Sequence, residues 1–408
     1  MKILLVNDAA TPLGGAEHMT LSLREAYRRR GHDALIFAST HGQHAGPCEA
    51  DMTCRSFSGP AQGVARVYNP WAASAFRRAV KEFDPDVVHV RMFLTQLSPA
   101  IMPMLKGRPH LYHATDYMMV CPSGHMLRSD GEPCRTPAGR VCRGQGCVSA
   151  AMYPLISVQL KTLWRRLKYA SAIVANSHNT KAMLEAGGVG PARVIWNGCD
   201  PTPARPPLED DAVPTAVCVS RLEKEKGVQV LIEAFGQAAG KVPAARLVIA
   251  GDGSMRGELE ARVAELGLSE RVTFLGRVGR EQQTELFKAA WVQVAPSLWR
   301  EPFGIVAVEA AFRGTAAIVT GGGLAEIVED GRTGYVVPMG DAEAMADRLV
   351  TVLSDRELAE SLGRRGRERA ERHFTLDTMA EQFLELYREI APGVAEQPGA
   401  EDAEAVRG

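Results

Sequence analysis

The chain has 408 residues, of which 46% are hydrophobic and 6% aromatic, so it is long enough to form two domains with sizeable cores. Its formal net charge of −1 gives no global preference for nucleic acid, and we predict no nucleic-acid partner. The charge is uneven, because residues 1–200 hold 23 Lys and Arg against 14 Asp and Glu. That surplus favours anionic partners, and a merely solvated basic surface is the open alternative.

The first half alternates short apolar runs with helical stretches. The first run, residues 3–7, predicts a buried strand rather than a cleavable leader, and a loop with Gly14 and Gly15 and a helix over 16–30 follow it. Further strands are expected at residues 34–38, 87–90, 110–113 and 172–175. This alternation predicts a parallel sheet with crossover helices.

The Pro-rich segment 200–207 is typical of a semi-rigid linker. After it, strands are expected at residues 215–220, 246–250, 272–275, 292–295 and 316–319. Helical stretches between them predict a second doubly wound unit. The expected fold is therefore α/β, with two Rossmann-like doubly wound parallel-sheet domains that face a cleft. Ligands of such sheets bind at the carboxyl ends of the strands.

The end of the chain divides into a helix and a tail. Apolar residues at helical spacing within 375–390 predict a final helix, whereas the tail beyond it has little to bury. We therefore expect a first domain over 1–200, a second over 201–373, the helix over 374–391 and a disordered tail over 392–408. No run of about 18 apolar residues occurs, so we expect no transmembrane helix and a cytoplasmic location.

The loop 220–227 follows a predicted strand and carries two cations. Arg221 lies at the strand end, and Lys226 lies near the start of the next helix. Such a pair can clamp two phosphates and offset the charge of a leaving nucleoside diphosphate. A solvated turn of mixed charge is the alternative.

A second loop, Gly251-Asp252-Gly253, also lies at a strand end. Glycines there allow close approach of a ligand to the backbone, and a simple tight turn is the alternative. The loop lacks the third glycine of a dinucleotide fingerprint, because Arg256 follows instead. This absence counts against a Rossmann oxidoreductase.

A third loop, residues 296–304, leads into an apolar helix that we expect to begin near Phe303. The amides of Phe303, Gly304 and Ile305 can donate to a sugar hydroxyl or a phosphate oxygen. Glu301 can accept from sugar hydroxyls, and Glu309 can accept from a ribose diol. An acidic residue at a helix start explains Glu301 alone, but it leaves Glu309 on an apolar helix face without a reason.

These loops, taken in order, resemble the retaining GT-B glycosyltransferases of family 4 (glycosyl transferases group 1). The resemblance covers nearly the whole chain and rests on an ordered set: Gly14-Gly15-Ala16-Glu17, Asn176-Ser177, Asn197-Gly198-Cys199-Asp200, Ser220-Arg221 with Lys226-Gly227, Gly251-Asp252-Gly253, Phe274-Leu275-Gly276, Glu301-Pro302-Phe303-Gly304 with Glu309, Gly321-Gly322-Gly323-Leu324-Ala325-Glu326 and Asp330-Gly331-Arg332-Thr333-Gly334-Tyr335. The family's last helix crosses back to the first domain, which fits residues 375–390.

The resemblance implies a role for each loop. Arg221 and Lys226 would bind the diphosphate of a UDP- or GDP-sugar donor, and Glu309 would hold its ribose. Glu301 and the amides of Phe303, Gly304 and Ile305 would hold the donor sugar. The loop from Gly276 to Val278 would lie near the base, and Gly15 and Gly251 near the diphosphate. No Asp-x-Asp motif occurs in a donor position, so Arg and Lys would replace a catalytic metal ion and no cofactor would be required.

The acceptor side departs from the family pattern. The family often has His-Asp at the end of a first-domain strand, and here Thr115 precedes Asp116. His113 lies two residues earlier on the same strand face, so it can reach the cleft or belong to the core. We expect Asp116 to act on the acceptor and keep His113 as a second candidate.

Four cysteines, Cys121, Cys134, Cys142 and Cys147, fall within a loop that is rich in Gly and Pro. Such a loop buries little, and four thiolates around one zinc ion would give it a local core. Reduced thiols or a disulfide pair are the alternatives. We expect a structural zinc at 121–147, beside the acceptor site.

Residues 157–169 combine Leu and Trp with four Lys and Arg. This pattern predicts either a helix on an anionic membrane, with peripheral contact at the inner membrane face, or an ordinary amphipathic helix on the sheet. The first alternative favours a lipid-linked acceptor.

The predicted function is that of a retaining glycosyltransferase that moves a sugar from a nucleoside-diphosphate sugar to a glycan, lipid-linked or small-molecule acceptor, on one face of the donor and without a metal ion. The alternatives are an epimerase or phosphorylase with the same fold, and a nucleotide-binding relative that has lost activity.

Overall fold

A computed structural model describes residues 1–11, 14–41, 46–129, 131, 134, 136 and 138–393. The chain divides into two compact units. Unit 1 comprises Met1–Asn197 and Leu376–Gly408, and unit 2 comprises Gly198–Thr375. The tail that we expected to be disordered lies outside the described residues from residue 394 onward.

Unit 1 is built on a seven-stranded parallel sheet in the order β3-β2-β1-β4-β5-β6-β7. Its strands are β1 (Lys2–Ala9), β2 (Asp33–Ser39), β3 (Met52–Cys54), β4 (Val87–Val90), β5 (His110–Ala114), β6 (Ala172–Ala175) and β7 (Arg193–Val194). Val87–Val90 and His110–Ala114 are buried along their whole length, as expected for strands that helices cover on both faces.

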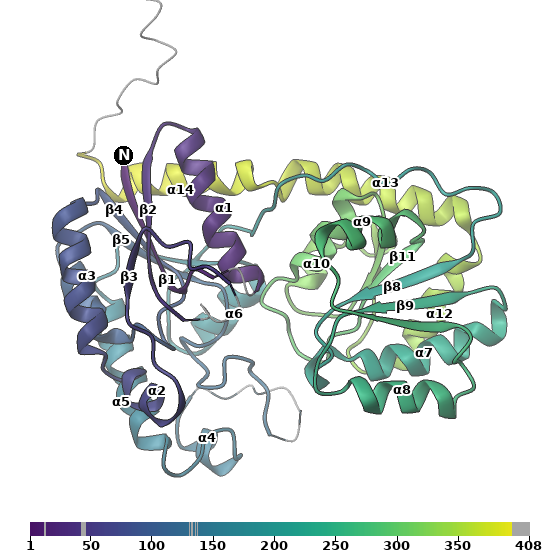
Figure 1. Ribbon diagram of the computed structural model, residues 1–408, viewed down its shortest axis with the longest axis horizontal. Coiled ribbons are helices and arrows are strands. Elements are labelled where there is room, and N and C mark those ends of the chain that lie inside the picture. Colours follow the sequence, from purple (N-terminus) through teal and green to yellow (C-terminus); the bar gives the residue numbers. More distant parts are fainter. Residues whose placement is uncertain are drawn as a thin grey trace, which may run out of the picture. The chain divides into compact units, whose positions relative to one another are not determined.

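The helices of unit 1 connect these strands and cover the sheet (Figure 1). They are α1 (Gly15–Arg29), α2 (Gly59–Ala65), α3 (Pro70–Phe83), the 3₁₀ helix η1 (Pro99–Leu105), α4 (Arg140–Gly144), α5 (Tyr153–Leu167), α6 (His178–Ala186) and α14 (Leu376–Ile390). Phe76 of α3 packs on Phe37 of β2, with ring centroids 5.1 Å apart. The apolar side of α5, with Leu160, Leu163 and Leu167, is buried, which fits an ordinary amphipathic helix at 157–169.

The final helix, α14, packs beside α1 in unit 1 (Figure 1). Its Tyr387 hydroxyl lies 2.6 Å from His89 Nδ1 of β4 and 3.0 Å from the Tyr27 hydroxyl of α1. Phe383 of α14 packs on the His89 ring at 4.6 Å. The Tyr387 hydroxyl thus joins α14 to α1 and to β4 through two buried hydrogen bonds.

Unit 2 is built on a six-stranded parallel sheet in the order β10-β9-β8-β11-β12-β13. Its strands are β8 (Thr215–Val219), β9 (Arg246–Ala250), β10 (Val272–Gly276), β11 (Val292–Ala295), β12 (Ala316–Val319) and β13 (Gly334–Val336). The predicted fold class, two Rossmann-like parallel-sheet domains, is therefore confirmed.

Helices cover both faces of this second sheet (Figure 1). They are the 3₁₀ turn η2 (Lys224–Lys226), α7 (Val228–Lys241), α8 (Arg256–Glu265), α9 (Arg280–Lys288), α10 (Ile305–Phe312), α11 (Leu324–Ile327), α12 (Ala342–Leu353) and α13 (Arg356–His373). The larger core lies between the sheet and α7, α8 and α12, and a smaller one includes Phe287 of α9 and Ala310 of α10. None of the helices in the described ranges is both long and apolar enough to cross a bilayer.

Candidate active site

The carboxyl ends of β8 and β11 meet at the point where the strand order of unit 2 reverses. The chain passes from β8 outward to β9 and β10 and then returns to β11, which pairs with the other side of β8. Lys226 lies on the loop after β8, and Glu301 lies on the loop after β11. Such a switch point is where doubly wound sheets bind ligands, because the two following loops diverge there.

Lys226 and Glu301 form a partly buried ion pair at this point. Lys226 Nζ lies 2.6 Å from Glu301 Oε1, and the side chains are 17% and 13% exposed. Ser297 Oγ donates to the same carboxylate oxygen at 2.6 Å, and the Lys226 ammonium lies 5.5 Å from the centre of the Trp299 ring. The sequence did not indicate Ser297 or Trp299, because both act through contacts that only the folded loop creates.

Arg221 lies on the same loop but is held much less tightly. Its side chain is 63% exposed and contacts Glu225 at 3.4 Å. An exposed pair of this kind contributes little to stability. The guanidinium can therefore turn toward an incoming anion at small cost, whereas Lys226 is already fixed.

Gly227 allows the loop after β8 to approach the loop after β11 closely. Gly227 has a φ of 71°, and a Cβ atom there would lie 2.0 Å from the carbonyl oxygen of Pro296. Leu298 N donates to Glu225 O at 2.8 Å, which fastens the same two loops. Only glycine fits this approach of two backbones, so Gly227 positions Lys226 next to Glu301.

Gly251 and Gly253 also serve contact between loops. A Cβ atom at Gly251 would lie 1.7 Å from Ser220 O, and one at Gly253 would lie 2.4 Å from Leu222 O. Leu222 N donates to Asp252 O at 3.0 Å. The glycines that we connected with a ligand therefore pack against the Arg221 loop, and a role for Gly251 at the diphosphate stays a prediction.

The helix after Glu301 begins later than we expected. It starts at Ile305, and Gly304 before it takes a left-handed φ of 105° because the Leu324 side chain occupies the space of a Cβ atom. Phe303 is 3% exposed and packs on Phe374, with ring centroids 5.9 Å apart. The prediction of a helix start near Phe303 is therefore wrong by two residues.

Glu309 lies in the second turn of α10, and the structure supplies the partner that its burial required. Gln283 Nε2 of α9 lies 3.4 Å from Glu309 Oε2. Burial raises the pKa of Glu309, and the nearby Arg313 opposes that shift. Arg313 is itself held by the Glu309 carbonyl at 2.9 Å. The carboxylate thus sits beside the α9 segment that follows Gly276 and Val278.

The two remaining glycines of the predicted donor site lie in different units. Gly276 ends β10 with a φ of 70°, and its carbonyl accepts from Gly251 N at 2.7 Å. Val278 follows on the partly exposed loop before α9. Gly15, in unit 1, is the first residue of α1 and is exposed, and the preceding Gly14 provides no side-chain cap.

Unit 1 has its own switch point, between β1 and β4, and Asp8 fills it. One carboxylate oxygen accepts from the amides of Gln96 and Leu97, and the other accepts from the amide and hydroxyl of Thr95, all within 2.9 Å. Asp8 is 4% exposed. This carboxylate therefore anchors the loop after β4 through four hydrogen bonds.

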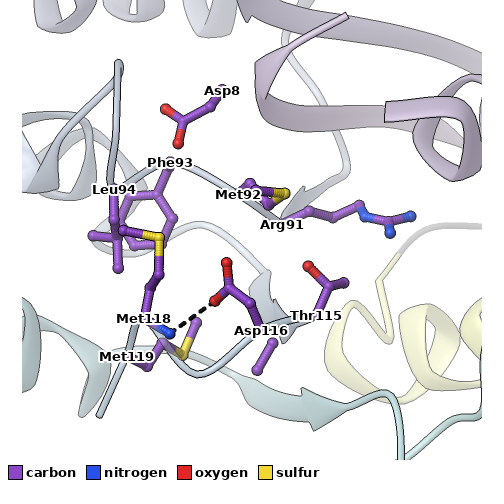
Figure 2. Close-up of a pocket in the computed structure, with 10 residues that line it drawn as sticks. Asp8, Arg91, Met92, Phe93, Leu94, Thr115, Asp116, Met118 and Met119 are labelled. Atoms are coloured by element: carbon purple, nitrogen blue, oxygen red, sulfur yellow. Dashed lines mark hydrogen bonds between the residues drawn. The ribbon is translucent and has the colours of Figure 1, made fainter. Parts of the chain in front are cut away.

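Asp116 lies in a pocket beside this anchor (Figure 2). Its Oδ1 atom accepts from Met118 N at 2.8 Å. Burial, together with the negative charge of Asp8, raises the pKa of Asp116 to about 6, and the Met118 amide opposes the shift. Thr115 lines the same pocket. A carboxylate with this pKa changes charge close to neutral pH.

His113 does not line that pocket, and a catalytic role for it stays a prediction. It is fully buried on β5, where its Nδ1 lies 3.2 Å from His89 Nε2 and its ring packs on Phe383 at 5.0 Å. Burial and the charge of Arg91 hold its pKa well below the ordinary value. His113 is a neutral core histidine under α14.

Arg91, which the sequence did not single out, is a buried cation at the edge of the pocket. It is 3% exposed, and its Nε and Nη1 atoms have no hydrogen-bond partner. Burial lowers its pKa to about 10, while Tyr27 and Glu17 of α1 favour its charged form. In Figure 2 its side chain extends away from Asp8. Its position directly after a buried strand was the available signal.

The sequence matches two families that describe the two halves of this arrangement. Residues 13–202 match Glycosyltransferase Family 4, and residues 204–369 match Glycosyl transferases group 1. Over 290 residues the chain is 30% identical to a glycogen synthase of Mycobacterium tuberculosis, which covers 69% of each protein. The chain is a GT-B glycosyltransferase of family 4. It is therefore a transferase enzyme, as predicted.

Other relatives of this family 4 enzyme align over a smaller part. An uncharacterized glycosyltransferase of Methanocaldococcus jannaschii is 31% identical over 57% of the chain, and the aligned part spans 60% of that protein. Among solved structures, a sucrose-phosphate synthase of Thermosynechococcus elongatus has a TM-score of 0.74 at 24% identity, over 96% of this chain and 99% of that one. Anabaena HepE, in complex with UDP and glucose, has a TM-score of 0.67 at 23% identity, over 95% and 99%.

The structural zinc that we expected in the cysteine loop of this glycosyltransferase is not supported by the structure. Cys121, Cys134, Cys142 and Cys147 line one cavity, but no group of three or more His, Cys, Asp or Glu in the described part of the chain is arranged to hold a metal ion. All eight cysteines are free thiols. Their sulfur atoms contact nearby oxygens instead, for example Cys134 Sγ with Thr136 O at 3.6 Å.

Proposed function

We propose that this enzyme transfers a sugar from a nucleoside-diphosphate sugar to an acceptor hydroxyl with retention of the anomeric configuration. The single observation that carries the proposal is the Lys226–Glu301 pair at the switch point of unit 2. A lysine can neutralise a phosphate, and a carboxylate can accept from sugar hydroxyls, so one pair recognises both parts of a donor.

The donor would replace part of this ion pair. Its diphosphate would take the Lys226 ammonium and draw in the exposed Arg221, while Glu301, still held by Ser297, would turn to the sugar hydroxyls. Glu309 would accept from the ribose diol. The amide of Ile305 at the start of α10 adds a donor for the sugar or the phosphate.

The reaction would proceed on one face of the donor sugar. The bond between the anomeric carbon and the phosphate oxygen breaks, the acceptor oxygen bonds to that carbon from the same side, and the acceptor proton passes to the leaving phosphate. Lys226 and Arg221 stabilise the charge that develops on this phosphate, so they supply the electrostatic work that a divalent cation performs elsewhere. The mechanism needs no enzymic nucleophile, and Asp116 would orient the acceptor hydroxyl in unit 1.

The names of the relatives support a nucleotide sugar but not one base. HepE binds UDP and UDP-glucose, whereas a relative 32% identical over 43% of the chain is a GDP-mannose-dependent mannosyltransferase of Mycobacterium tuberculosis. Their acceptors also differ, since another relative is an N-acetyl-glucosaminyl malate synthase of Bacillus anthracis. We therefore propose a UDP- or GDP-sugar as the donor.

The test is a panel of UDP-, GDP- and ADP-sugars, scored by thermal stabilisation and by slow hydrolysis of the donor. We expect one nucleotide class to stabilise the enzyme, since a ligand at 100 times its Kd adds about 2.7 kcal/mol. Hydrolysis should release the α-anomer from an α-linked donor and should survive EDTA. Inverted product, or epimerised donor in the absence of acceptor, would overturn the proposal.

A further inference from the structure

A groove of about 420 Å³ adjoins the Asp116 pocket in unit 1. The two hollows share Met118, whose amide also holds Asp116. Val148, Met152 and Ile156 give the groove much of its apolar lining. A ligand in this groove can place one end beside Asp116 while the rest of it contacts apolar side chains.

Arg66 supplies a cation to the same groove. Its Nε atom is buried without a hydrogen-bond partner. The Arg66 carbonyl accepts from Gln159 Nε2 of α5 at 2.7 Å, which fixes the end of α2. Burial lowers the pKa of Arg66, and Asp8 opposes that shift, but the Asp8 carboxylate already accepts hydrogen bonds from the loop after β4. A buried donor without a partner is costly, and phosphate oxygens are the acceptors that a guanidinium binds best.

An apolar ridge lies next to Arg66 in the sequence. Val64 of α2, Tyr68 of the following loop and Trp71 of α3 are 62%, 63% and 57% exposed. Trp71 packs on Phe57 at 5.4 Å, and the Arg55 guanidinium lies 5.7 Å from that ring. Isolated exposed apolar residues are ordinary, but two aromatics with a valine and flanking arginines form the composition found at membrane interfaces.

We propose that the acceptor is a membrane-anchored lipid phosphate: its phosphate binds Arg66, its tail passes over Val64, Tyr68 and Trp71 into an anionic bilayer, and its sugar reaches Asp116 through the groove. This inference deepens the proposed function and rests on it. Arg66 lines the groove that shares Met118 with the Asp116 pocket, and Val64 and Tyr68 lie two residues before and after Arg66 in the sequence.

This surface differs from the one that the sequence suggested. The segment 157–169 forms most of α5, whose leucines are buried and whose Trp164 Nε1 donates to Met119 O at 2.9 Å. The apolar side of α5 packs in the core of unit 1. The side chains of Val64, Tyr68 and Trp71 are exposed instead, and can therefore contact a bilayer.

The first experiment measures sedimentation of the full chain with vesicles of phosphatidylcholine, with and without phosphatidylglycerol, at low and high salt. We expect binding to the anionic vesicles that salt weakens and that Tyr68→Ser with Trp71→Ser lowers at least about fivefold. Val158→Ser with Tyr169→Ser removes two apolar side chains that are 53% and 47% exposed in and just after α5, and should leave binding unchanged. Equal losses of vesicle binding in both double variants would overturn the proposal that Tyr68 and Trp71 contact the bilayer.

The second experiment compares farnesyl phosphate, farnesol and inorganic phosphate as ligands, by isothermal titration. Farnesyl phosphate should bind, and Arg66→Gln should weaken it about tenfold, the factor that about 1.4 kcal/mol represents. Farnesol and inorganic phosphate should bind more weakly, because each lacks one half of the site. Equal affinity of farnesol and farnesyl phosphate, or of the variant and the wild type, would overturn the role of Arg66.

Donor binding separates failure of this inference from failure of the proposed function. Every variant lies in unit 1, so all should keep the thermal stabilisation that the donor nucleotide gives, which also shows that they fold. If the protein binds and hydrolyses the donor but binds neither anionic vesicles nor farnesyl phosphate, the proposed function stands and the lipid-acceptor inference fails. A protein that binds no nucleotide would lose the proposed function itself.

Discussion

The two units share one topology but use the same place in it differently. In each, the strand order reverses beside the first strand of the sheet, between β1 and β4 in unit 1 and between β8 and β11 in unit 2. In unit 1, Asp8 fills that place and accepts four hydrogen bonds from its own chain. In unit 2, Lys226 and Glu301 fill it with charges that remain partly exposed.

The difference shows what makes a switch point a ligand site. The Asp8 carboxylate is satisfied internally, so binding a ligand there would cost four hydrogen bonds. The Lys226–Glu301 pair joins two partly exposed charges that contact Ser297 and the Trp299 ring, and we propose that a diphosphate and a sugar replace each charge with a better partner. We therefore place the proposed acceptor of unit 1 in the neighbouring Asp116 pocket rather than at the switch point itself.

The largest effect should follow loss of the unit 2 cation. We expect Lys226→Met to lower kcat for sugar transfer by about 10²–10³, because a group that stabilises charge in the transition state is lost. Arg221→Met should cost less, since that side chain is 63% exposed before binding. Steady-state kinetics with the preferred donor measures both. Equal losses of kcat in the two variants would contradict the central role that we propose for the Lys226–Glu301 pair.

The next largest effect should follow substitution of Gly304, the residue before α10 in unit 2. Gly304→Ala places a Cβ atom 2.3 Å from Leu324 Cδ2 at a φ of 105°, so we expect a loss of about 2–3 kcal/mol in stability and weaker donor binding. Gly331→Ala is the matched control, with a φ of 71° and open space around its Cβ, and should cost about 1 kcal/mol. Urea denaturation of both variants would show whether the clash or the φ angle dominates.

Removal of the unit 1 anchor should destabilise the protein without touching donor binding. Asp8→Asn keeps the shape but loses the charge and half the acceptors, so we expect a loss of about 2 kcal/mol. Urea denaturation gives the change in stability, and titration with the donor nucleotide gives its affinity. A fall in nucleotide affinity as large as that of Lys226→Met would contradict the division of roles.

The smallest effect concerns pH and Asp116. Transfer should rise with pH through about 6 as Asp116 loses its proton, and Asp116→Asn should be slower and lack this rise. Because burial raises the pKa of Asp116 above its unfolded value, the folded protein binds this proton more tightly. The charged form therefore costs stability above about pH 6 but not below about pH 4, so Asp116→Asn should be relatively more stable at pH 7 than at pH 4.

Much of the fold followed from local pattern. The short apolar runs predicted most strands of both sheets within one or two residues, because a strand covered on both faces must be apolar along its length. The short strands β3, β7 and β13 carry too few residues for such a pattern and were not expected. The predicted start of α10 was two residues early, because Gly304 takes a left-handed φ of 105° that is not helical.

By itself, the sequence determined the two-domain α/β class and the family, and it indicated the loops that we propose to bind the donor, since ordered motifs and apolar periodicity are local properties. Only the tertiary structure decided which groups meet. It paired Lys226 with Glu301, placed His113 in the core beneath Phe383, left the Nε atoms of Arg91 and Arg66 buried without partners, and formed no disulfide among the described cysteines. These outcomes depend on contacts between segments far apart along the chain, which no local pattern encodes.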